Sequence, residues 1–141
     1  MDYGKLKKSF EDHRFLTSYF ETKEEAASYL KEKIRGERVG FGGSRTCQEM
    51  GLYELLKENN QVVWHWEGGA LRDAVLTDVY ITSANALAET GEIVNIDGNG
   101  NRVSSTLYGH QKVYFLVGVN KVAPDFEAAL WRARNVAAPK R

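Results

Sequence analysis

The chain has 141 residues, of which 43% are hydrophobic and 27% charged, and Lys+Arg and Asp+Glu both number 19. This composition is typical of a soluble globular protein with one core, and a net charge of zero argues against nucleic acid as the main partner. No apolar run approaches the roughly 20 residues of a membrane span, and none follows the N-terminus, so we expect a cytoplasmic protein without a signal peptide or membrane contact.

Predicted helices and strands alternate along the chain. The helices are expected at residues 2–20, 22–36, 46–58, 70–76 and 103–108 and from Pro124 onward. The strands are expected at residues 38–41, 61–66, 78–82, 93–96 and 112–119. This alternation predicts an α/β fold with a mainly parallel sheet covered on both faces, and residues 93–96 are expected to form a local antiparallel piece.

Two capping boxes mark predicted helix starts. Thr22 with Glu25 three residues later predicts the start of one helix, and Gly36 predicts its end. Thr46 with Glu49 predicts the start of the next helix in the same way.

A glycine-rich turn follows the strand predicted at residues 38–41, in the sequence VGFGGSRTCQEMG. Glycine lets a ligand approach the backbone closely, and hydroxyl groups beside a helix start can donate to an anion. Gly42, Gly43, Ser44 and Thr46 are therefore candidate anion ligands, and the alternative is a tight turn capped by Thr46. The turn lacks the lysine of a P-loop and the third spaced glycine of a Rossmann fingerprint, so it is not a standard nucleotide motif.

The segment at residues 82–109 reads TSANALAETGEIVNIDGNGNRVSSTLYG and holds more polar chemistry than a hairpin needs. Glu89 follows apolar residues and is a candidate base or nucleophile, and the alternative is a turn acid that caps local N–H groups. Asn99, Asn101 and Arg102 are candidate pocket residues, and the alternative is an elaborated turn with side-chain hydrogen bonds.

The cysteine and the histidines indicate no metal site. The single cysteine, Cys47, excludes an internal disulfide and is expected to be a buried thiol. His13, His65 and His110 lack the spacing of metal ligands. His65 is expected on a strand, and His110 is the histidine to test as catalytic.

Three segments of the chain resemble one protein family. They read VGFGGSRTCQEMGL, DVYITSANALAETGEIVNIDGNGNRVSSTLYGHQKVYFLVGVNKV and RARNVAAP. In this order they resemble the LUD domain of lactate-utilisation proteins (LutB/LutC, YkgG-like), over about residues 20–139. The resemblance implies a three-layer α/β/α sandwich of the NagB/RpiA/CoA-transferase type, with residues 1–20 as a helical arm and residues 21–141 as the LUD domain.

The resemblance also implies site residues. Class I CoA-transferases carry a nucleophilic glutamate in a Glu-Asn-Gly type motif, and Glu89-Thr90-Gly91 is similar to it, with Thr90 in place of Asn. Glu89 is thus the candidate catalytic residue. In the wider group the glycine-rich turn after the first strand contributes to the ligand pocket, which corresponds to Gly42, Gly43, Ser44 and Thr46. Together with the residues singled out from the sequence itself, the candidate ligand-binding residues are Gly42, Gly43, Ser44, Thr46, Asn85, Thr90, Gly91, Asn99 and Arg102.

The expected function follows from the same family. It is the binding of a small anionic metabolite (an organic acid, a sugar phosphate or a CoA-type ligand) at the carboxyl ends of the strands. The alternative is a non-catalytic subunit or scaffold of a lactate-oxidising iron–sulfur complex, and a homodimer is a further possible assembly. Longer relatives continue into closely spaced cysteines, whereas this sequence stops at residue 141, so we expect no cofactor and no metal.

Overall fold

The computed structural model describes residues 1–140, which fall into two compact units. The larger unit comprises Tyr19–Ser83 and Asn99–Leu116. The smaller unit comprises Met1–Ser18, Ala84–Gly98 and Val117–Arg141. Each unit is therefore assembled from stretches that are separated in the sequence.

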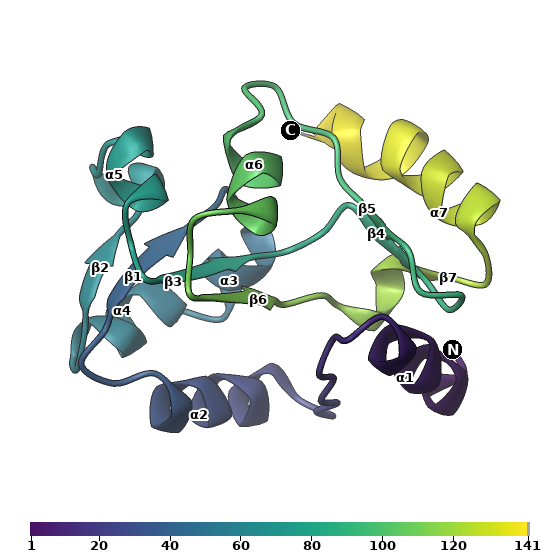
Figure 1. The fold of residues 1–141 in the computed structure, drawn as a ribbon, viewed down its shortest axis with the longest axis horizontal. Helices are drawn as coiled ribbons and strands as arrows, with labels where there is room; N and C mark the ends of the chain where they lie inside the picture. Colours follow the sequence, from purple (N-terminus) through teal and green to yellow (C-terminus); the bar gives the residue numbers. More distant parts are fainter. Residues whose placement is uncertain (141) are drawn as a thin grey trace. The chain divides into compact units, whose positions relative to one another are not determined.

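The larger unit contains a four-stranded sheet in the order β2-β1-β3-β6, and all neighbouring strands are parallel (Figure 1). The strands are β1 (Arg38–Phe41), β2 (Gln61–Val63), β3 (Val79–Thr82) and β6 (Lys112–Phe115). All four were predicted, but β2 and β6 are shorter than expected. β2 gives way to a short 3-10 helix, His65–Glu67, so the prediction that His65 lies on a strand is wrong. The N–H of Gly69 donates to the carbonyl of Trp64 at 2.9 Å and closes this turn.

Helices cover both faces of this sheet. One face carries α2 (Lys23–Lys33), α3 (Arg45–Glu49) and α4 (Leu52–Lys57), and the other carries α5 (Leu71–Val75) and α6 (Asn101–Leu107) (Figure 1). The main core lies under the first set and includes Leu30, Val39, Phe41, Cys47, Leu52, Leu56, Trp64, Val79 and Ile81. These layers confirm the predicted α/β/α arrangement and the predicted burial of the thiol.

The helix starts agree with the sequence in one case and differ in another. The Thr22 hydroxyl accepts from the N–H of Glu25 at 3.1 Å, so the first capping box marks a true start. The next helix is capped by Ser44 and not by Thr46. The helix predicted at residues 46–58 is also divided into α3 and α4 at Gly51, whose φ of 65° ends a right-handed helix.

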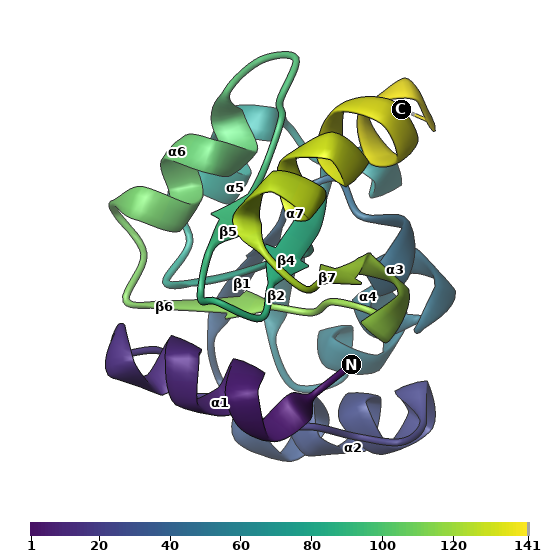
Figure 2. The same ribbon diagram turned by 90° about the vertical axis from the view of Figure 1, so that its right-hand side faces the viewer.

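The smaller unit contains a three-stranded sheet in the order β5-β4-β7 (Figure 2). Its strands are β4 (Ala86–Ala88), β5 (Ile93–Val94) and β7 (Val122–Ala123). β4 and β5 are antiparallel, as predicted for the local piece, whereas β4 and β7 are parallel. β4 and β7 were not among the predicted strands, because such short strands lack a period that stands out in the sequence.

Two helices complete the smaller unit. α7 (Phe126–Arg132) packs its buried Ala129 against the alanines of the sheet, and the chain continues through a π-helical turn, Ala133–Ala137, into Ala138–Lys140. α1 (Tyr3–Asp12) is shorter than the helical arm predicted at residues 2–20. It ends because Arg14 adopts a φ of 70°, outside the right-handed helical region.

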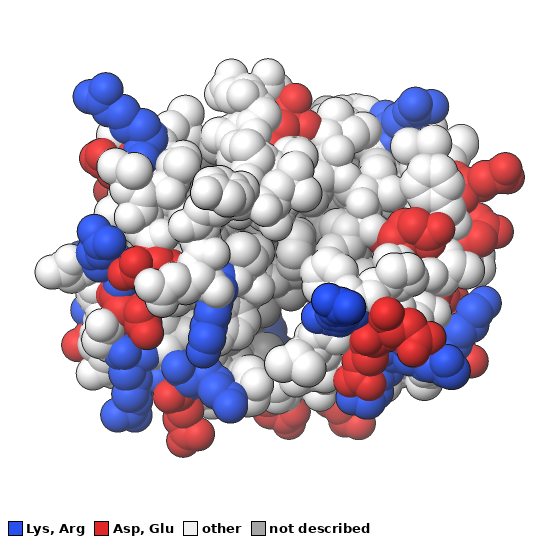
Figure 3. Space-filling view, viewed as in Figure 1, with Lys and Arg blue, Asp and Glu red and all other residues white. Residues whose placement is uncertain are grey.

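Charged side chains of both signs are interspersed on the face shown in Figure 3. No helix within residues 1–140 is long and apolar enough to cross a membrane.

Candidate functional site

Two hydroxyl groups and the stem of an arginine converge on Gly42, just beyond the carboxyl end of β1. A Cβ atom at this position would lie 2.6 Å from the Tyr80 hydroxyl oxygen, 2.9 Å from the Thr82 hydroxyl oxygen and 3.1 Å from Cγ of Arg102. The N–H of Gly42 donates to the carbonyl of Ile81 at 2.9 Å, which holds the turn beside β3. Any residue larger than glycine at this position would displace one of these neighbours. The close packing of the neighbouring side chains therefore requires a glycine in the turn.

Arg102 reaches this point from α6, where the aliphatic stem of its side chain packs against Gly42. Its side chain is only 8% exposed, although arginine is rarely buried in proteins. One helical turn later, Ser105 is 1% exposed, and its hydroxyl has no hydrogen-bond partner among residues 1–140. The spacing of three residues places both side chains on the face of α6 that packs on the sheet. The carboxyl ends of β1 and β3 thus carry a buried cation and several hydroxyl groups.

The remaining residues predicted in the larger unit have different surroundings. The Ser44 hydroxyl is buried and accepts from the N–H of Cys47 at 3.1 Å, so it serves as the cap of α3. Thr46 lies half-buried in the first turn of that helix. Gly43 lies against Trp66, whose Cζ2 would be 3.2 Å from a Cβ at this position. Asn99 is exposed in the turn before α6.

The other predicted residues lie in the smaller unit, around the β4–β5 hairpin. A carboxylate oxygen of Glu89 accepts from the N–H of Asp2 at 3.0 Å. The Asn85 side-chain oxygen accepts from the N–H of Ile96 at 2.7 Å and ties the two strands together. Thr90 donates its hydroxyl proton to Glu92.

Gly91 completes that hairpin with a φ of 106°, a conformation that favours glycine. A Cβ at this position would lie 3.0 Å from Nδ1 of His13, so the turn also packs closely on the segment after α1. Asn85, Glu89, Thr90 and Gly91 therefore each have a structural partner inside the smaller unit.

His110, the histidine predicted for a catalytic test, is held by its neighbours. Its Nδ1 lies 2.7 Å from the carbonyl oxygen of Thr77, and because a carbonyl only accepts, Nδ1 carries the proton. The ring stacks on Tyr80 with centroids 4.7 Å apart. His110 therefore braces the tyrosine whose hydroxyl reaches Gly42.

Sequence reasoning missed four side chains around the turn. Tyr80 and Thr82 are two residues apart on β3, which places them on one face, and this period was the signal that could have found them. Ser105 follows Arg102 by one helical turn. Trp66 had no such signal, because its position depends on the 3-10 turn after β2.

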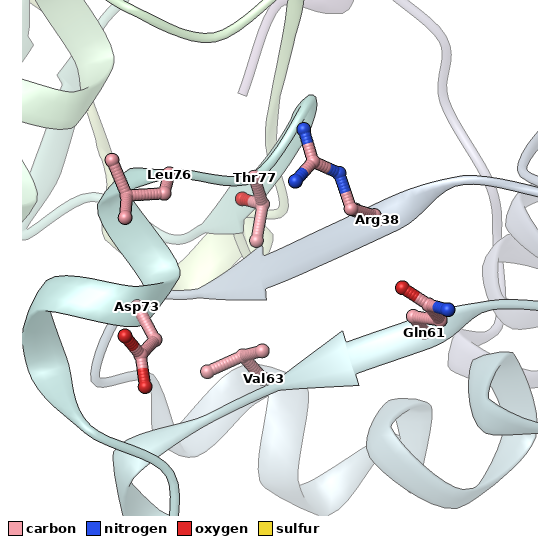
Figure 4. A pocket seen from close by; sticks show the side chains of 6 residues that line it. All are labelled: Arg38, Gln61, Val63, Asp73, Leu76 and Thr77. Atoms are coloured by element: carbon pink, nitrogen blue, oxygen red, sulfur yellow. The ribbon is translucent and has the colours of Figure 1, made fainter.

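A separate cavity of about 220 Å³ lies between α5 and the strands β1 and β2 (Figure 4). It is lined by Arg38, Gln61, Val63, Asp73, Leu76 and Thr77. The Arg38 guanidinium is paired with Asp78 at 3.2 Å, and the Thr77 hydroxyl donates to the carbonyl of Ala74 at 2.8 Å. Two of the polar groups at this cavity are thus already partnered, and the glycine turn is not part of its lining.

Residues 1–140 contain no cluster of three His, Cys, Asp or Glu side chains that could hold a metal ion. The fold is that of an α/β protein with a glycine-rich turn at the carboxyl ends of parallel strands, beside a buried arginine of α6. The family model of the LUD domain matches residues 3–141, and the chain belongs to this family. Neither the search of curated proteins nor the search of solved structures returned a match.

Proposed function

We propose that this LUD-domain protein serves lactate utilisation by binding a small anionic metabolite at the Gly42 turn of the larger unit. An organic acid, a sugar phosphate and a CoA-type ligand each carry the required negative group. The observation that supports the proposal is the convergence of Arg102, Tyr80 and Thr82 on Gly42. Hydrogen bonds to a charged partner are roughly twice as strong as neutral ones, and arginine recognises carboxylate and phosphate groups in a bidentate manner.

The proposed ligand lies where open α/β sheets bind theirs, beyond the carboxyl ends of the strands. The Tyr80 and Thr82 hydroxyl groups gathered at Gly42 would donate to the anion, and Arg102 would supply the charge. The Ser105 hydroxyl, buried one helical turn from Arg102, would supply a further donor. Ser44 would act indirectly, because its hydroxyl already caps α3.

The test is calorimetric titration of the protein with lactate, pyruvate, ribose 5-phosphate and a CoA ester. We expect at least one of them to bind, and Arg102→Met to weaken its binding by about 10-fold or more, as expected for the loss of a charged hydrogen bond worth roughly 1.5–3 kcal/mol. Arg72→Met is the matched control, because it removes an exposed arginine on α5 in the same unit. Equal losses in both variants would indicate general electrostatic attraction and contradict the proposed site.

The resemblance to CoA-transferases gives Glu89 a separate proposed role as a catalytic carboxylate. Its carboxylate accepts from the backbone of Asp2 and is half-buried. Once a reaction is assigned to the protein, Glu89→Gln should abolish turnover while ligand binding is retained. A fully active Glu89→Gln protein would remove this role.

A second candidate function is that of a non-catalytic subunit or scaffold. It is favoured by apolar side chains that are exposed on α5 and at the end of α6. These side chains are Leu71, Val75, Leu76, Leu107 and Tyr108. Apolar groups at this density on adjacent helices are suited to contact with another protein chain.

A further inference from the structure

Trp66 presents an indole ring to solvent directly beside the glycine turn. Its side chain is 42% exposed, whereas Trp64, two residues earlier, is 1% exposed. The Cζ2, Cε2 and Nε1 side of the Trp66 ring lies against Gly43, at 3.2, 3.6 and 3.7 Å from the position of a Cβ there. An exposed aromatic ring thus adjoins the proposed anion site, within the same unit.

The ring of Trp66 is held in place by other rings. It stacks on Trp64 with centroids 5.2 Å apart and planes 21° apart. Trp64 in turn stacks on the buried Phe41 at 4.9 Å. His65 meets Trp66 edge-on at 5.9 Å. Trp66 is therefore the outermost member of an ordered stack that is anchored in the core, and its orientation is fixed before a ligand arrives.

A stack of aromatic rings that ends at the surface can be extended by one more flat ring. Aromatic rings favour offset, nearly parallel packing, and a nucleobase has the same flat π surface as a side chain. Lys33 lies over the ring of Tyr29 and Lys57 over the ring of Tyr53, and neither contact involves Trp66.

We infer that the anion bound at the Gly42 turn belongs to a nucleotide, whose base stacks on Trp66 while its phosphate lies at Gly42 and Arg102. This inference rests on the proposed function, because the phosphate occupies the site proposed there. Because Gly43 lies against Trp66, the phosphate site and the base site are neighbours. The ribose of the nucleotide would lie between these two sites. A nucleotide site of this kind uses no P-loop or Rossmann motif, which accords with the sequence around residue 42.

The experiment compares adenosine monophosphate with ribose 5-phosphate, which has the same sugar phosphate but no base. Binding is measured by calorimetry and by quenching of tryptophan fluorescence. Because base stacking on an aromatic side chain is worth about 1–3 kcal/mol, the wild-type protein should bind the nucleotide about 5- to 150-fold more tightly. The nucleotide should also quench the fluorescence.

Three variants assign the effect to one residue. Trp66→Leu should abolish the preference for the nucleotide and its quenching while leaving the affinity for ribose 5-phosphate unchanged, which also shows that the variant is folded. Trp66→Phe should retain part of the preference. Trp131→Phe removes a 62% exposed tryptophan of the smaller unit and should behave like the wild type.

The outcomes separate this inference from the proposed function. Equal affinities for the two compounds in the wild-type protein, or a preference that survives in Trp66→Leu, would overturn the base-stacking role and leave the anion site standing. Binding of lactate or pyruvate without binding of either sugar phosphate would do the same. Failure of every anion to bind would overturn both.

Discussion

At the scale of single residues, the site depends on Gly42, because glycine has no side chain. Gly42 leaves the space in which the Tyr80 hydroxyl, the Thr82 hydroxyl and the Arg102 side chain approach one another. Any larger residue at this position would meet two oxygen atoms of rigidly held strand residues. The sequence showed that a glycine-rich turn lies here, but not which side chains surround it. They come from β3 and α6, and Tyr80, the nearest of them in sequence, lies 80 − 42 = 38 residues further along the chain.

His65 supplies a residue-scale prediction of pH dependence. Burial lowers the pKa of His65 from its usual 6.5, and its Nδ1 has no hydrogen-bond partner among residues 1–140. Well above pH 6.5 the ring is neutral in both the folded and the unfolded chain. As the pH falls through 6.5, the unfolded chain binds a proton that the folded ring takes up less readily, so the free energy of unfolding falls.

The comparison is between urea unfolding of the wild type and of His65→Gln at several pH values from 8 to 5. The wild type should lose more stability over this range, because the variant lacks the titrating ring while the other titrating groups are unchanged. Parallel stability curves for the two proteins would show that His65 titrates alike in the folded and unfolded chains.

At the scale of elements, the parts of the chain with a clear local pattern or a helix cap were predictable. The strand at residues 38–41 has the predicted bounds, and α2 begins where Thr22 and Glu25 place it. The errors lie where tertiary contacts outweigh local patterns. A helical pattern runs through residues 46–58, yet Gly51 interrupts it, and a strand pattern runs to residue 66, yet the chain folds into a 3-10 turn after Val63. That turn places Trp66, so its role could not be predicted from sequence.

Gly40 provides an element-scale prediction, because it sets how closely α5 packs on β1. A Cβ at this position would lie 2.6 Å from both the Ala74 carbonyl oxygen and the Thr77 hydroxyl oxygen. Gly40→Ala should therefore lower the free energy of unfolding by about 1–3 kcal/mol through overpacking. Gly4→Ala in α1 is the control, since its nearest contact would be 3.5 Å away and alanine favours a helix.

Both glycine variants can be measured by urea unfolding under one set of conditions. The expected order of stability is Gly4→Ala at or above the wild type and Gly40→Ala clearly below it. A Gly40→Ala protein as stable as Gly4→Ala would mean that α5 moves away from β1 without cost, and the close packing of these two elements would not contribute to stability.

At the scale of the whole molecule, the two units are interleaved in the sequence. The larger unit is completed by residues 99–116, which follow the β4–β5 hairpin of the smaller unit. The predicted division into an arm of residues 1–20 and one domain of residues 21–141 is a different partition, and that boundary stays a prediction. Sequence patterns report on neighbouring residues, so they cannot show which distant segments share a core.

The second candidate function predicts the behaviour of the intact protein in solution. Leu76 and Leu107 are 69% and 79% exposed on α5 and α6, so replacing both with glutamate should change the free energy of unfolding by no more than about 0.5 kcal/mol per site. If these side chains form an interface with a second copy of the chain, the wild type should show a concentration-dependent rise in mass by light scattering, and the double variant should stay monomeric. Leu16→Glu, at a 98% exposed position in the smaller unit, is the matched control and should associate like the wild type. The double variant should stay monomeric because burying a charged side chain without a partner opposes association. A wild type that is monomeric at all concentrations would exclude this homodimer. A double variant that still associates like the wild type would place the interface on another surface.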